Sequence, residues 1–142
     1  VWLLILLTLH PRIQPQWWQV AGLAPALMLG IALRFISNYA LALLAFWTTK
    51  IESIDQVHWS IDQFLGGRLA PLSVMPLFIQ TIAWYAPFRW IVVFPVELAM
   101  GHMSERQFLE GILMQLIWLV ISYGVFRLMW AIGIRRYSAV GA

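Results

Sequence analysis

The chain of 142 residues is 62% hydrophobic and only 11% charged, with a formal net charge of +3 and no cysteine. Soluble domains carry about 25% charged residues, so this composition excludes an ordinary soluble protein and indicates an integral membrane protein. The nine Lys and Arg residues are scattered, which argues against a nucleic-acid partner, and a chain without cysteine has neither disulfides nor thiolate metal ligands.

The first predicted element is the apolar run of residues 1–9, VWLLILLTL. Crossing a bilayer takes about 20 apolar residues, so this run is too short to cross alone. It lacks the basic region and the small-residue cleavage site of a signal peptide. We therefore expect the second half of a spanning helix here, and we expect residues 1–142 to form a single transmembrane domain, the C-terminal portion of a larger protein.

Residues 20–47 form the first complete predicted span, because they are almost unbroken in apolar character and long enough to cross with some tilt. Within them, Arg34, Ser37 and Asn38 recur at spacings that place all three on one helical face. A charge near the middle of a membrane costs at least about 2.5 kcal/mol, so this face should point into protein or a wet cavity. Either it is the polar wall of a substrate path, or Arg34 pairs with a carboxylate on a neighbouring helix or reaches the interface.

The next segment, residues 48–58, is the most polar part of the chain and is expected outside the hydrocarbon. Residues 57–71 form the next predicted crossing element, with Asp62 as its only acid and a broken end at the glycine pair 66–67 and Pro71. A glycine pair can also bind phosphate. A phosphate loop, however, needs a strand before it, a longer glycine pattern and a helix after it, and none of these is recognisable here.

Residues 64–101 are organised by proline and glycine. Four of the seven prolines lie here, and each removes a backbone donor and obstructs the preceding helical turn. The pattern predicts two short helices, residues 76–87 and 88–101, neither of which is long enough to cross. Broken apolar helices are tolerated in a membrane where protein or a water-filled cavity provides hydrogen-bond partners for the freed backbone N–H and C=O groups. We therefore expect a re-entrant hairpin that enters from the outer face.

This predicted hairpin is the candidate gate of a transport path. Its prolines restrict the backbone, so the two short helices would move as one rigid piece on glycine hinges. Alternatively, Gly101 only ends a helix in a left-handed conformation. Glu97 either bridges to Arg89 or faces the mouth of the path. The candidate gate and hinge residues are Gly66, Gly67, Pro71, Pro76, Pro87, Phe88, Pro95, Glu97 and Gly101.

The last predicted helix covers residues 112–134 and follows a polar loop at residues 102–110. In that loop, Ser104 and Gln107 have the spacing of a capping box, in which each side chain binds the other residue's backbone N–H. The helix ends at a basic pair, residues 135–136.

Together these elements predict an all-α, polytopic membrane protein with about four spanning helices, the first truncated, plus one outer-face re-entrant hairpin. Because cytoplasmic loops carry an excess of Lys and Arg, the placement of Lys50, Arg135 and Arg136 favours a cytoplasmic C-terminus. The three histidines fall in separate polar turns and cannot converge on a metal or a nucleophile. No enzyme and no cofactor are therefore expected.

Four stretches carry a family resemblance: the helix ending in AFWT at 45–48, the GG-x3-PL-x3-P run at 66–76, the APF-x6-P-x5-G run at 86–101, and the tail GIRRYSAVGA. In this order and spacing they resemble the membrane-spanning permeases of bacterial type 2 ATP-binding-cassette transporters. The resemblance implies a subunit with six spanning helices in the bacterial inner (plasma) membrane, and two such subunits, identical or different, that form the pore.

The same resemblance implies a cytoplasmic ATP-binding-cassette ATPase as a separate partner subunit, beside the second permease subunit and the lipid bilayer. ATP hydrolysis by that partner would drive substrate outward, so the chain would supply half of the pathway of an exporter. The alternative is a non-transporting membrane scaffold or accessory subunit. The sequence does not select a substrate.

Overall fold

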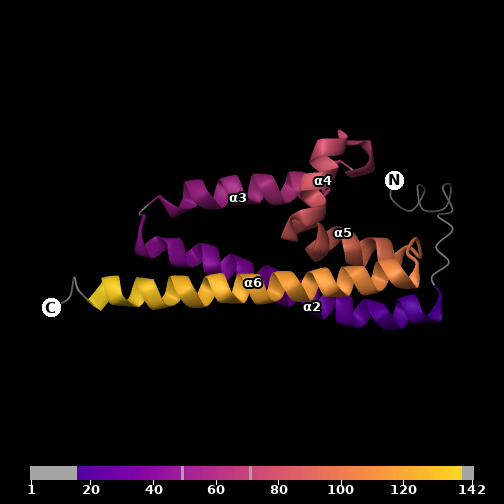
Figure 1. Cartoon of the computed structure of the whole chain (residues 1–142). Coiled ribbons are helices and arrows are strands. Elements are labelled where there is room, and N and C mark those ends of the chain that lie inside the picture. Colours follow the sequence, from indigo (N-terminus) through magenta and orange to yellow (C-terminus); the bar gives the residue numbers. More distant parts are fainter. Residues whose placement is uncertain (1–15, 49, 71, 139–142) are drawn as a thin grey trace, which may run out of the picture.

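The computed structural model describes residues 16–48, 50–70 and 72–138, and all regular elements within these ranges are helices (Figure 1). In chain order they are α2 (Trp17–Ala42), the 3-10 helix η1 (Leu43–Phe46), α3 (Ile51–Leu65), the 3-10 helix η2 (Leu72–Val74), α4 (Leu77–Tyr85), α5 (Pro87–Ala99) and α6 (Glu105–Ser138). The predicted all-α class is confirmed. The apolar run at residues 1–9 lies outside the described residues.

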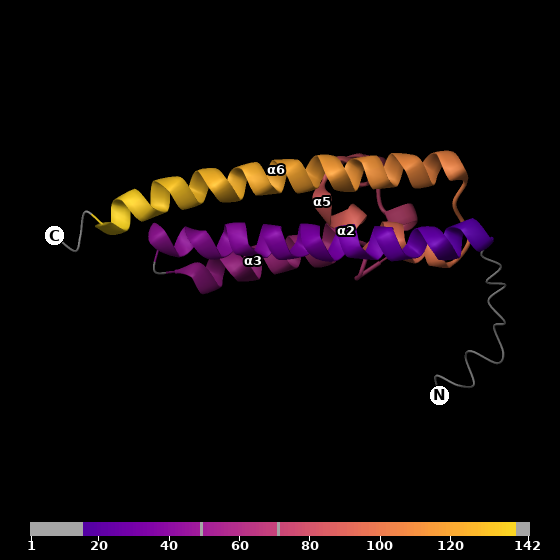
Figure 2. The same ribbon diagram turned by 90° about the horizontal axis from the view of Figure 1, so that it is seen from below.

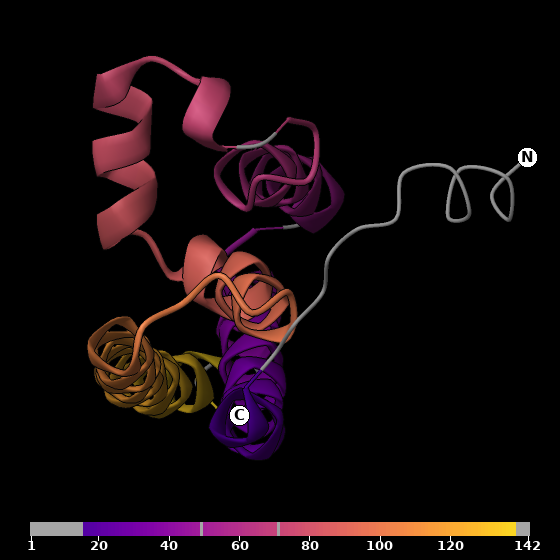
Figure 3. The same cartoon turned by 90° about the vertical axis from the view of Figure 1, so that its right-hand side faces the viewer.

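Two long helices define the axis of the molecule. α2 and α6 run side by side in the same direction, so that both begin at one end of the molecule and end at the other (Figures 1 and 2). α5 packs on both at the end where α6 begins, and α3 runs along the other half of the molecule. Viewed along the axis, α4 stands on the flank and runs across the direction of the other helices (Figure 3).

Within the described residues, fewer helices are long enough to cross a membrane than the three complete predicted spans that fall there. α2 with η1 and α6 are long and apolar enough, and the bent pair α4 and α5 would add a third span if it crosses as one unit. α3 does not qualify, which corrects the predicted crossing at residues 57–71. Its 15 residues extend about 22 Å, whereas the hydrocarbon core is about 30 Å thick.

The physical reason for this difference lies at the two ends of α3. The helix begins at Ile51, inside the polar segment, because Glu52 in its first turn is favoured by the helix dipole. It ends at Leu65, because Gly67 adopts a positive φ of 65° that terminates the helical path. The helix therefore begins and ends about six residues earlier than the predicted element at 57–71, so it includes part of the polar segment and is too short to cross.

The two short helices predicted before and after Pro87 are confirmed. Ala86 is extended, with φ of −81° and ψ of 151°, because a residue before proline avoids the helical region. Pro87 then starts α5, where its missing N–H costs nothing, and the axes of α4 and α5 differ by 96°. α5 continues through Pro95, so that proline does not break the chain.

α6 begins earlier than predicted. The Ser104 backbone N–H donates to Gln107 Oε1 at 2.9 Å, and the Gln107 N–H donates to Ser104 Oγ at 3.4 Å. This is the predicted capping box, and it starts the helix at Glu105. The polar loop expected over residues 102–110 is therefore mostly the first turn of α6, which corrects that boundary.

α5 lies in the interior of the bundle. Its side chains Trp90, Phe94 and Leu98 are buried with Ala26 of α2. The contact with α6 depends on a close approach, because a methyl group added at Gly111 would overlap the ring of Phe94. The apolar face of α5 is thus held between α2 and α6.

A buried glutamine joins the same three helices. The Gln115 side chain of α6 is fully buried, and its Nε2 donates to the carbonyl oxygens of Ala26 at 2.9 Å and Trp90 at 2.8 Å. Buried hydrogen bonds in an apolar setting are costly to break, because the freed groups have no water to bind. Gln115 therefore fixes the position of α5 against α2 and α6.

Candidate functional site

A small cavity of about 40 Å³, with polar side chains in its lining, lies between α2, α3 and the beginning of α5. All three predicted pathway residues face it, together with two of the predicted gate residues. Its lining consists of Arg34, Ser37, Asn38, His58, Asp62, Pro87, Phe88 and Ile91. We call it the path cavity. The structure therefore brings Arg34, Ser37 and Asn38 to one place, as their spacing in the sequence predicts.

Asp62 is the charged centre of this region. Its side chain is only 3% exposed, and its Oδ2 accepts a hydrogen bond from Arg34 Nη2 at 3.2 Å. Arg68 Nη1 lies 3.3 Å from the same oxygen. We call these three residues the Asp62 cluster. The cluster bears out one of the two alternatives for Arg34, pairing with a carboxylate on a neighbouring helix, while Arg34 still borders the path cavity.

Ser37 and Asn38 each border a second hollow as well. Ser37 lies 3.4 Å from Ser122 of α6, oxygen to oxygen, and it lines a groove of about 230 Å³ between α2 and α6. Asn38 lines a hollow of about 280 Å³ beside the acidic beginning of α3, which contains Glu52 and Asp55. The polar face of α2 thus separates three neighbouring hollows.

A larger groove, of about 520 Å³, lies between the end of α3, α4 and α5. Three of the predicted gate residues line it: Gly66, Gly67 and Glu97. We call it the α4–α5 groove. Arg89 Nη2 donates to Glu97 Oε2 at 3.3 Å within this groove, so the predicted bridge between these residues is present. The Arg89 guanidinium also lies 4.8 Å from the ring centre of Trp84, a cation–π contact.

The remaining gate candidates are distributed over the fold. Pro76 precedes α4, Pro95 is buried inside α5, and Gly101 follows α5. Pro87 and Phe88 border the path cavity instead of the groove. Pro71 lies outside the described residues. The eight candidates within the described residues therefore do not form one site.

The two positive-φ glycines end their helices in the same way. Gly67 has φ of 65° and Gly101 has φ of 78°. In each case the next N–H binds a carbonyl five residues back: Arg68 to Gln63 at 3.2 Å, and His102 to Glu97 at 3.2 Å. This is the Schellman pattern of helix ends. The left-handed cap proposed as the alternative for Gly101 is therefore its observed conformation.

Sequence reasoning did not select three residues that matter here: Asp62, Arg68 and Gln115. For Asp62 the signal was available, since it is the single acid in an apolar segment opposite a helix that carries Arg34. Gln115 is likewise a polar residue inside an otherwise apolar run. Among the described residues no group of His, Asp and Glu is arranged to hold a metal ion.

The helices and the path cavity define a multi-pass helical membrane protein whose polar residues meet between its helices. The family model of the ABC-2 family transporter proteins matches residues 2–141. The chain therefore belongs to this family and is a membrane permease component of an ATP-binding-cassette transporter. The resemblance stated from the sequence is confirmed, and the family implies an ATP-binding subunit as partner. No curated protein and no solved structure gives a significant match.

Proposed function

We propose that this permease component forms half of a substrate path in an exporter of the bacterial inner membrane, and that the path cavity lies on that route. The supporting observation is the meeting of Arg34, Ser37 and Asn38 with Asp62 between three helices. Polar and charged side chains are costly in a membrane interior, so a cluster of them around a cavity is a typical site for substrate passage. The partners in this proposal are a cytoplasmic ATPase subunit and a second permease subunit.

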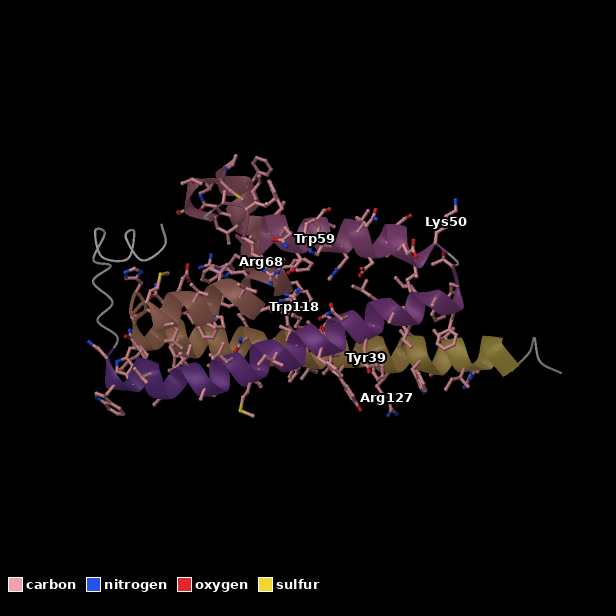
Figure 4. All side chains as sticks on the ribbon, turned by 180° about the vertical axis from the view of Figure 1, so that it is seen from behind. Tyr39, Lys50, Trp59, Arg68, Trp118 and Arg127 are labelled. Atoms are coloured by element: carbon pink, nitrogen blue, oxygen red, sulfur yellow. The ribbon has the colours of Figure 1, made fainter. Side chains whose placement is uncertain are left out.

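The proposed orientation places the C-terminal end of α6 in the cytoplasm. Figure 4 shows Lys50 at the end of the bundle where α6 terminates, far from the end where α6 begins. Arg135 belongs to that same terminus of α6. An excess of basic residues at one end supports a cytoplasmic location for that end. In this orientation α5 reaches toward the outer face, and the re-entrant character of the α4 and α5 pair stays a prediction.

A pair of serine substitutions tests the proposed path. Ser37→Val narrows the path cavity without touching the Asp62 cluster, whereas Ser53→Val makes the same chemical change at an exposed position of α3. Cells would express the permease with its ATPase subunit, and the measurements are membrane abundance and efflux of amphipathic fluorescent dyes that the wild type exports. We expect Ser37→Val to slow efflux about tenfold at unchanged abundance, the usual effect of a small volume change in a pocket.

The control variant and the alternative function each predict a different efflux result. Ser53→Val should export as the wild type does, because it does not border the path cavity. Wild-type efflux by a well-expressed Ser37→Val permease would show that the path cavity is not on the route. A non-transporting scaffold would give no dye efflux that depends on this chain at all.

A further inference from the structure

The α4–α5 groove has the composition of a site for an amphiphile. One wall is apolar and consists mainly of Val92, Val93 and Val96 of α5. The polar end carries Arg68 and Arg89. Figure 4 shows Arg68 between the end of α3 and α5, away from both ends of the bundle. A ligand with an apolar body and one polar group would match both parts.

Charge around the groove is not balanced. Three guanidinium groups lie in and beside the groove, those of Arg68 and Arg89 in its lining and that of Arg34 in the adjoining path cavity. They face two carboxylates, Glu97 in the groove lining and Asp62 in the path cavity. Asp62 is shared by two of the arginines, and Glu97 is matched by Arg89. One positive charge is therefore in excess in a largely apolar part of the molecule, where an anion would lower its free energy.

Hydrogen-bond donors are also in excess. A guanidinium has five N–H donors, and Arg89 makes one ion pair, with its Nη2 donating to Glu97 Oε2 at 3.3 Å. Its Nε is buried and has no hydrogen-bond partner among the described residues. Arg68 is 31% exposed and contacts only the shared oxygen of Asp62 in the ion pair described above. Both arginines can therefore donate further bonds to a ligand oxygen.

We propose that the α4–α5 groove binds the phosphate of a membrane lipid carrying one negative charge. A phosphodiester offers two charged oxygens that match the planar guanidinium of arginine. The glycerol and the first carbons of the acyl chains would lie against the three valines. This site is separate from the path cavity, because the lining residues of the two hollows do not overlap.

The test measures lipid retained by the full polypeptide purified in detergent, using native mass spectrometry. The probes are phosphatidylglycerol, diacylglycerol with the same acyl chains, and inorganic phosphate. Arg68→Gln removes one donor while Asp62 keeps Arg34, and Val96→Trp fills the groove without changing charge. Arg106→Gln is the matched control, since Arg106 is 90% exposed and paired with Glu110 on α6.

We expect the wild type and Arg106→Gln to retain phosphatidylglycerol and not diacylglycerol. Arg68→Gln should lower the retained lipid about tenfold, the usual loss when one charged hydrogen bond is removed. Val96→Trp should lower it by a similar factor, because the indole ring takes the space of the lipid in the groove. Wild-type retention by both variants would overturn the proposal. Full displacement of the lipid by millimolar inorganic phosphate would also overturn the proposal, because the groove would then bind free phosphate and not a lipid. Ser37→Val should retain lipid normally, which separates this test from that of the substrate path.

Discussion

Asp62 provides the sharpest test of the structure, because one carboxylate holds two arginines from different segments. Asp62→Asn keeps the size of the side chain but removes its charge, leaving Arg34 and Arg68 beside each other without an anion. Removing one partner of a buried ion pair costs about 3–5 kcal/mol. The Asp62 side chain is 3% exposed, but the arginines left behind are 38% and 31% exposed and partly solvated, so the lower end of this range applies.

Removal of either arginine should cost much less. Arg34→Leu leaves Asp62 paired with Arg68, and the Arg34 side chain is 38% exposed, so we expect a loss of about 1 kcal/mol. Arg34→Leu together with Arg68→Leu leaves the buried carboxylate alone and should again cost about 3–5 kcal/mol. The effects of the two arginine substitutions are therefore expected to be strongly non-additive.

The assay is thermal unfolding of the purified protein in detergent, with membrane abundance as a second readout. We expect Asp62→Asn to lower the melting temperature by roughly 8 °C or more and Arg34→Leu by about 3 °C. Asp55→Asn is the matched control, because it makes the same change at an exposed position of α3. A melting temperature of Asp62→Asn within a degree of the control would refute the role assigned to the Asp62 cluster.

Two further predictions concern packing and topology. Gly111→Ala should lower the melting temperature, because the added methyl group would overlap Phe94. Gly124→Ala, on the same helix, places its methyl group in open space. It should raise the melting temperature slightly, since alanine favours a helix by about 1 kcal/mol over glycine. Equal effects at the two glycines would contradict the contact between α5 and α6. Asp55→Cys, in a chain with no native cysteine, should react with a membrane-impermeant thiol reagent only after cells are opened, and labelling of intact cells would reverse the proposed orientation.

The parts of the fold that local rules determine were predictable from the sequence. Apolar length gave α2 and the body of α6, and Pro87 placed the bend before α5. The spacing of Ser104 and Gln107 gave the capping box. Each of these features depends on residues within a few positions of one another, so no knowledge of the tertiary structure is needed.

Helix boundaries in polar segments were harder to predict. Both α3 and α6 begin within stretches whose polarity suggested a loop. Polar residues do not prevent a helix: Glu52 and Glu105 lie in first turns, where a negative charge is favourable, and Arg106 pairs with Glu110 one turn later. Hydropathy indicates which residues lie in the hydrocarbon of the membrane, but it does not indicate the residue at which a helix begins.

The candidate site was predicted only in part, because its residues come from distant segments. The spacing of Arg34, Ser37 and Asn38 placed them on one face, but 28 positions separate Arg34 from Asp62. Gln115 bonds Ala26 from 89 positions away. Such pairs depend on how the helices pack against one another, and this packing cannot be read directly from a single sequence.

The packing of α5 also limits how a gate in this region can move. Moving α4 and α5 as one rigid piece would expose Trp90, Phe94 and Leu98, and exposure to water at the mouth of a path costs about 1.5–3 kcal/mol for each large apolar side chain. Their sum, about 4.5–9 kcal/mol, is comparable to or larger than the roughly 5.5 kcal/mol that takes a two-state equilibrium from 1:99 to 99:1. α4 has a single buried residue, Ala83, and most of its other side chains are exposed. We therefore infer that a gate motion turns α4 at the extended residue Ala86 while α5 stays in the core.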